Sequence, residues 1–142
     1  MSVDQAKKQL ELSESRWEAA VREHAQPPPD AGFARRLRAL ADAAAQEQAA
    51  YRYAADQGFG WRPGPAWLPP RELRPAAWRE SLAPADAWER FDDAVEGLSR
   101  ARTGLSVLAI SQAFGVLSTA ASELADEVEH TRRRASRSID AA

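Results

Sequence analysis

A Glu-x-x-His motif near the C-terminus is the arrangement in this sequence that most resembles a metal site. Glu127 and His130 stand three residues apart, so on a helix both side chains point to the same side. Di-iron helical bundles use this spacing, but they add a second such motif and two further glutamates. The only other histidine, His24, has Val21 three residues before it. We therefore expect no metal and no cofactor, and we predict that Glu127 lies on a solvated face.

A segment rich in tryptophan, arginine and proline, residues 58–84, offers binding chemistry of another kind. Aromatic rings and arginines together can bind a nucleotide, an anionic metabolite or a protein surface. The candidate binding residues are Trp61, Arg62, Trp67, Arg71, Arg74 and Trp78. The alternative is a structural role, in which the aromatic side chains cover an open seam of the fold. The prolines stiffen the segment, so an ordered connector is predicted in both cases.

Four arginines near the C-terminus, Arg132, Arg133, Arg134 and Arg137, form a basic run. Such a run can contact nucleic-acid phosphates, or it can complement the negative end of a helix dipole. Four arginines make few phosphate contacts, and the formal net charge of the chain is −2. Nucleic acid is therefore not the expected partner, and residues 135–142 are predicted to form a disordered tail.

Several residue patterns that enzymes require are missing. The chain has no cysteine, which excludes disulfides, thiolate catalysis and cysteine-bound zinc. It also has no recognisable serine–histidine–aspartate set, no glycine-rich phosphate loop and no acid pair with a catalytic setting. The sequence predicts a non-enzymatic helical interaction or regulatory protein of a bacterial cytoplasm, with a protein partner of unknown identity. The alternatives are a small-ligand sensor that uses the tryptophan–arginine segment and a nucleic-acid accessory protein that uses the basic run.

The elements that must position these residues include a 20-residue stretch without charge, residues 103–122. A helix of this length reaches across a bilayer core. However, its serines, threonines and glutamine would be costly at membrane depth. The stretch is therefore predicted to belong to a buried helix of a soluble bundle, and no membrane contact is expected.

Two rows of residues follow the helical period in this stretch. A bulky apolar stripe is predicted to face the core and contains Ile110, Phe114, Leu117, Ala121, Leu124 and Val128. Beside it lies a row of small residues, Ser111, Gly115, Ser118 and Ser122, which we call the serine row. Small side chains allow another helix to approach closely. That helix belongs either to the same chain or to a second copy, so the row is also a candidate self-association surface of a homodimer.

The whole pattern predicts an all-α, single-domain protein over residues 1–134. The expected helices cover about residues 3–25, 31–57, 85–102 and 107–133. They form two antiparallel hairpins joined by the ordered connector, which makes a four-helix bundle. Gly58 and Gly104 are expected to end helices, Gly104 in the left-handed conformation, while Ser106 caps the last helix. Glu47 interrupts the apolar stripe of the second helix. The runner-up is a three-helix core whose first helix docks loosely or is swapped into a dimer.

Overall fold

The computed structural model describes residues 3–24, 32–58, 81–104 and 106–140. These residues form helices without any strand, which confirms the all-α prediction. The helices are α1 (Val3–His24), α2 (Phe33–Asp56), α4 (Ala85–Thr103) and α5 (Val107–Asp140). Residues 59–80, which make up most of the predicted connector, lie outside the described part of the chain.

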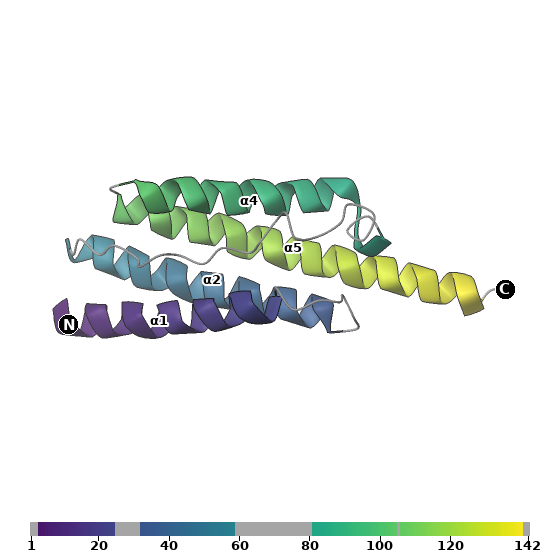
Figure 1. Cartoon of the computed structure of the whole chain (residues 1–142), viewed down its shortest axis with the longest axis horizontal. Helices are drawn as coiled ribbons and strands as arrows, with labels where there is room; N and C mark the ends of the chain where they lie inside the picture. Colours follow the sequence, from purple (N-terminus) through teal and green to yellow (C-terminus); the bar gives the residue numbers. More distant parts are fainter. Residues whose placement is uncertain (1–2, 25–31, 59–80, 105, 141–142) are drawn as a thin grey trace.

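The four helices are elongated along one common axis and pack as a bundle (Figure 1). α2 and α5 lie at the centre and make the most extensive contact, while α1 packs on α2 and α4 packs on α5. Neighbours in the order α1, α2, α5, α4 run in opposite directions (Figure 1). This order brings the start of α1 and α5 and the end of α2 and α4 to the same end of the bundle.

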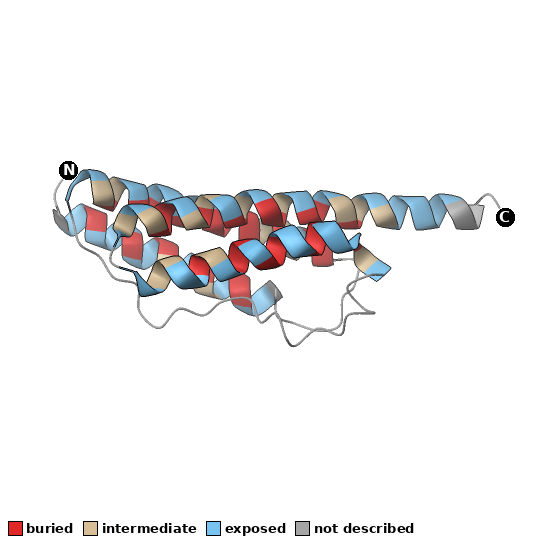
Figure 2. Cartoon of the chain, turned by 90° about the horizontal axis from the view of Figure 1, so that it is seen from above, coloured by how far each residue is buried: buried red, intermediate tan, exposed pale blue. Residues whose placement is uncertain are grey.

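Aromatic side chains pack between the helices, including pairs of helices whose backbones are not in contact. Phe114 of α5 lies 5.2 Å from the Trp17 ring of α1, edge to face, and 5.6 Å from the Tyr51 ring of α2, stacked. Toward the other end, Phe33 of α2 lies 6.1 Å from Trp88 of α4. Such pairs stabilise a core beyond the area that they bury. The buried residues accordingly lie on the sides of the helices that face one another (Figure 2).

The glycines at two helix ends differ in conformation. Gly58 follows α2 with φ +68°, the left-handed conformation that glycine adopts without strain. Gly104 follows α4 with φ −84°, so the left-handed conformation predicted for it is wrong. Its amide instead donates to the carbonyl oxygen of Ala101 at 3.1 Å, and its backbone is extended. The Ser106 cap is present, because its hydroxyl accepts from the Ala109 amide at 3.1 Å.

The C-terminal part of α5 differs from the sequence prediction. The helix continues to Asp140, so residues 135–140 are helical and do not form the disordered tail expected from residue 135. The segment contains no glycine or proline, and its arginines complement the negative end of the helix dipole. In the picture this end of α5 reaches well beyond the other three helices (Figure 1).

α5 is also the one described helix that is long and apolar enough, by length and composition, to cross a membrane. The core helix of a soluble protein passes the same test. Within the chain, the bulky apolar stripe of α5 packs in the core, where Phe114, Leu117, Ala121 and Leu124 are fully buried.

Candidate functional site

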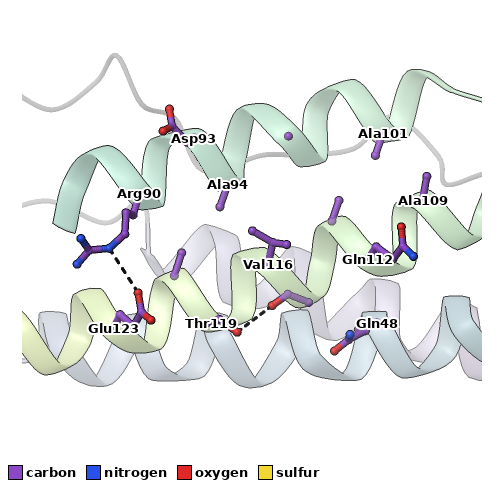
Figure 3. Close-up of a pocket in the computed structure, with 14 residues that line it drawn as sticks. Gln48, Arg90, Asp93, Ala94, Ala101, Ala109, Gln112, Val116, Thr119 and Glu123 are labelled. Carbon is purple, nitrogen blue, oxygen red and sulfur yellow. Dashed lines mark hydrogen bonds and ion pairs between the residues drawn. The ribbon is translucent and has the colours of Figure 1, made fainter. Parts of the chain in front are cut away.

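An open groove between α4 and α5 is the strongest candidate for a binding surface. Its volume is about 860 Å³, and most of its lining is apolar. Two rows of short side chains form its walls. They are Ala94, Gly97 and Ala101 on α4, and Ala109, Ala113, Val116 and Ala120 on α5. Figure 3 shows Ala94 and Ala101 pointing toward α5, while Ala109 and Val116 point toward α4.

The groove exists because large side chains fill only the inner edge of the α4–α5 interface. Phe91 and Leu98 of α4 are buried in the core, as are Phe114 and Leu117 of α5. The alanines and the glycine at the outer edge are too short to reach across. The hollow they leave has the volume of a small-molecule site and the open shape of a helix-binding groove.

Polar and exposed apolar side chains border the groove. At one end Arg90 Nε lies 3.5 Å from Glu123 Oε2, an ion pair that connects α4 to α5 (Figure 3). Gln48 of α2 and Gln112 of α5 line the opposite part. Val116 is 61% exposed although it is apolar, so the groove presents hydrophobic surface to solvent. A polar rim around an apolar floor is the usual composition of an interface.

The serine row faces α2 of the same chain, and of its four members Gly115 also lines the groove. The Ser111 hydroxyl donates to the carbonyl oxygen of Gln48 at 2.7 Å, and the Ser118 hydroxyl donates to that of Ala41 at 2.7 Å. Gly115, between them, lies against the Gln48 side chain. Ser122, one turn further, is half-buried. The structure therefore engages the row within the chain, and a homodimer that used it would first have to displace α2.

A cluster of buried charged residues at the other side of the core escaped the sequence analysis. Arg102 of α4 forms an ion pair with Glu14 of α1, with 2.8 Å between Nη2 and Oε1, and both side chains are mostly buried. The Tyr51 hydroxyl of α2 donates to the second Glu14 oxygen at 3.4 Å. The Arg102 guanidinium also lies 5.7 Å from the centre of the Phe114 ring. The cluster thus joins all four helices, including pairs whose backbones are not in contact.

Glu47 of α2 completes this cluster. It is 0% exposed, and its carboxyl group lies beside the Glu14 carboxyl and the Ser13 hydroxyl. Burial raises its pKa to about 9, assisted by the nearby Glu14 carboxyl and opposed by Ser13 and Arg102. Burial also acts to raise the pKa of Glu14, but hydrogen bonding with Glu47, Arg102 and Tyr51 outweighs it and lowers the pKa. Glu47 is therefore neutral at pH 7 and can share its proton with the Glu14 carboxylate.

This pair of carboxyl groups has the opposed pKa shifts that catalytic acids and bases often show. A general acid or base must reach the substrate within hydrogen-bond distance, however. Glu47 is sealed inside the core, so we assign the pair to helix packing. From sequence, the one signal of the cluster was the position of Glu47 on an otherwise apolar stripe.

The structure leaves the tryptophan–arginine candidate site untested and places the Glu127–His130 motif on α5. Trp61, Arg62, Trp67, Arg71, Arg74 and Trp78 all lie outside the described residues. Glu127 is half-buried and His130 is exposed on α5. Across the described segments, no group of three histidine, aspartate or glutamate side chains could hold a metal ion.

Comparison with known proteins identifies no relative of this chain. No protein-family model matches it, and neither a curated protein nor a solved structure shows a significant match.

Proposed function

We propose that this protein is a non-enzymatic helical interaction protein that binds an apolar helix of a partner protein in the α4–α5 groove. The observation that carries the proposal is the open apolar groove, with its volume of about 860 Å³ and its walls of mainly alanine and glycine. A groove of this kind binds a helix through side chains spaced three and four residues apart.

The dimensions of the groove support a helix as the occupant. The wall residues of α5, from Ala109 to Ala120, extend over about 16 Å, which is three turns of a helix. Short side chains on both walls allow a third backbone to come close, and Val116 offers an apolar contact that is now in solvent. The ion pair of Arg90 and Glu123 at one end provides polar groups that can fix the direction of the bound helix.

The proposal is tested by photo-crosslinking in cells of the native host. Benzoylphenylalanine replaces Val116 in the full-length chain, and it replaces Leu12 of α1 in a control, because Leu12 is similarly exposed, at 54%, and lies outside the groove. We expect a discrete product with another protein from position 116 and none from position 12. Adding Ala113→Arg should abolish the product, whereas adding Leu12→Arg should not.

Two outcomes of this experiment would contradict the proposal. One is the same set of products from both positions, which would mean that the crosslinker reports only exposure. The other is a product with twice the mass of the chain, which would identify a second copy as the occupant and favour the homodimer.

The small-ligand sensor remains the second candidate, and the groove volume favours it because small-molecule sites span about 300–1,000 Å³. A thermal-shift screen with nucleotides and acidic metabolites tests it. Stabilisation that is lost in Trp67→Ala would assign the ligand to the tryptophan–arginine segment. Stabilisation that is lost in Ala113→Arg would assign it to the groove.

We also propose that the protein acts in a bacterial cytoplasm. Its four helices are proposed to form two antiparallel hairpins joined by an ordered connector over residues 58–84. A connector that packs on the bundle should place its tryptophans in an apolar environment. Native-state fluorescence that shows fully water-exposed tryptophan would argue against it.

A further inference from the structure

The C-terminal part of α5 carries a basic stripe on a helix that stands clear of the bundle. Residues 132–137 are exposed, and this part of the helix extends past the other helices in both views (Figures 1 and 2). His130, Arg133, Arg134 and Arg137 follow the spacing i, i+3, i+4, i+7, which places them along one side of a helix. We call these four residues the basic stripe.

The three arginines of the basic stripe are exposed and make no direct ion pair inside the described chain. Arg133 lies near enough to Glu129 to help lower its pKa, but none of the three has a carboxylate of a described residue within 4 Å. The nearby acids are engaged elsewhere, because Arg38 of α2 binds Asp126 at 2.8 Å and Glu129 at 3.0 Å. The positive charge of the stripe therefore remains available to a partner.

The distribution of charge along the chain sets this extension apart. The chain has 19 basic and 21 acidic residues, and four of the basic ones are Arg132, Arg133, Arg134 and Arg137. Without them, 15 basic and 21 acidic residues remain, a net charge of −6. An acidic body with one basic, projecting element attracts a polyanion to that element and repels it from the rest.

We infer that the basic stripe of α5 docks on the phosphate backbone of a double-stranded nucleic acid. Arginine binds phosphate through two parallel hydrogen bonds, and serine, present here as the exposed Ser136, is also a common phosphate contact. A helix is about 10–12 Å wide and the major groove of DNA about 12 Å. A helix that projects from its bundle, as α5 does, has the width and the clearance to enter that groove.

The composition of the extension argues against the other polyanionic partners. Insertion into a membrane surface needs an apolar helix face, and between residues 130 and 140 only Ala135 and Ile139 are apolar. A tight interface with an acidic protein needs aromatic or aliphatic anchors, which the segment also lacks. The surface is distinct from the α4–α5 groove, so this inference does not rest on the proposed function.

The test measures binding of the full-length protein to a fluorescent 20-base-pair DNA duplex by anisotropy, with duplex RNA as a second probe. We expect saturable binding to a duplex at 50 mM salt. Its affinity should fall with salt with a log–log slope of about −3, because three arginines each contact one phosphate. The variant Arg133→Gln/Arg134→Gln/Arg137→Gln should bind at least about tenfold more weakly.

A matched control separates the stripe from net charge. The variant Arg22→Gln/Arg52→Gln/Arg100→Gln removes the same charge from exposed positions on the body of the bundle, and its affinity should stay within about twofold of the original. Circular dichroism must show an intact helical signal in both variants. Three results would overturn the inference: no saturable duplex binding, equal losses in the two variants, or tighter binding to polyglutamate or to anionic lipid vesicles than to either duplex.

Discussion

The two sides of α5 show how similar small residues can produce a closed interface on one side and an open groove on the other. Toward α2, the serine row lies against the neighbouring helix and bonds to its backbone. Toward α4, alanines face Ala94, Gly97 and Ala101 across a hollow of about 860 Å³. Both sides allow a close approach of helices, but only the first is closed.

The difference lies in what the small side chains can bind. The Ser111 hydroxyl bonds to the carbonyl oxygen of residue 48, and the Ser118 hydroxyl bonds to that of residue 41. The two serines are seven residues apart on α5, and the two carbonyl groups are seven residues apart on α2. This spacing keeps the antiparallel helices in register over two turns. Alanine and glycine on the α4 side have no side-chain donor or acceptor, so they leave space without holding a neighbour in it. Small residues allow two helices to approach closely, but a hydrogen bond or a bulky side chain is needed to hold the two helices in contact.

The largest expected effect concerns Glu47, which is buried in the core beside Glu14 and Arg102 and away from the open groove. Its pKa is about 9 in the folded chain and about 4.5 when unfolded. Between these values the native state holds a proton that the unfolded state has lost. The free energy of unfolding should therefore fall as pH rises, by about 1.4 kcal/mol per pH unit. Urea unfolding from pH 5 to pH 9 measures this slope.

Glu47→Gln should flatten this slope because a neutral amide replaces the neutral carboxyl. The matched control is Glu123→Gln at the rim of the open groove, where the carboxylate is exposed and the slope should persist. Glu14 acts in the opposite direction, since its pKa is lowered: its stabilisation is present above its unfolded value and is lost as pH falls below it. Equal slopes for the original chain and Glu47→Gln would show that Glu47 is not buried as described.

The next largest effect compares one side chain added in the packed core with one added in the open groove. Ala44 of α2 is fully buried, whereas Ala113 lines the groove and is half-buried. Ala44→Leu should destabilise the protein by about 1–3 kcal/mol or more, because the packed core has no room for extra methyl groups. Ala113→Leu should change stability by no more than about 0.5 kcal/mol, since its side chain extends into the hollow. Similar losses in chemical unfolding would mean that the groove is closed in solution.

A smaller effect is expected from the hydroxyl groups that hold α2 and α5 in register. Ser118→Ala removes the bond to the Ala41 carbonyl oxygen and leaves that oxygen part-buried, which should cost about 1 kcal/mol. The control is Thr119→Ala, because Thr119 is exposed and its hydroxyl donates to Gly115 in its own helix. The control should change stability by less than about 0.5 kcal/mol. If Thr119→Ala costs as much, the bond between helices is not what closes this side.

Helical periodicity was enough to predict the helices and the core stripe of α5. Phe114 and Leu117 recur at the spacing of one helix face, and both are fully buried. In the same pattern Glu47 stands as a charged interruption of the apolar stripe of α2. Its burial depends on Glu14 and Arg102, which are 33 and 55 residues away in the sequence, and a pattern within one helix cannot identify such partners.

The candidate groove could not be predicted for a related reason. The small residues of α4 and α5 are visible in the sequence, but a hollow forms only where two short faces oppose each other. That requires the rotation of both helices about their axes, which the inner residues Phe91 and Phe114 determine by packing in the core. The end of α5 was missed because serine and arginine after residue 134 resemble a frayed tail, although neither residue stops a helix.

The smallest effect provides the most direct measure of how close α2 and α5 are. Gly115 of α5 and Gly97 of α4 both lie within helices, where alanine is favoured over glycine by about 0.8–1 kcal/mol. A methyl group added at Gly97 meets nothing within 4 Å, so Gly97→Ala should stabilise the protein by nearly this full amount. A methyl group added at Gly115 collides with the end of the Gln48 side chain, which is exposed and can turn into solvent. Gly115→Ala should therefore gain less, and the difference in thermal unfolding between the two variants measures the cost of moving Gln48. If Gly115→Ala instead loses more than about 1 kcal/mol, the backbones are closer than the Gln48 contact implies, and the row resists any side chain larger than hydrogen.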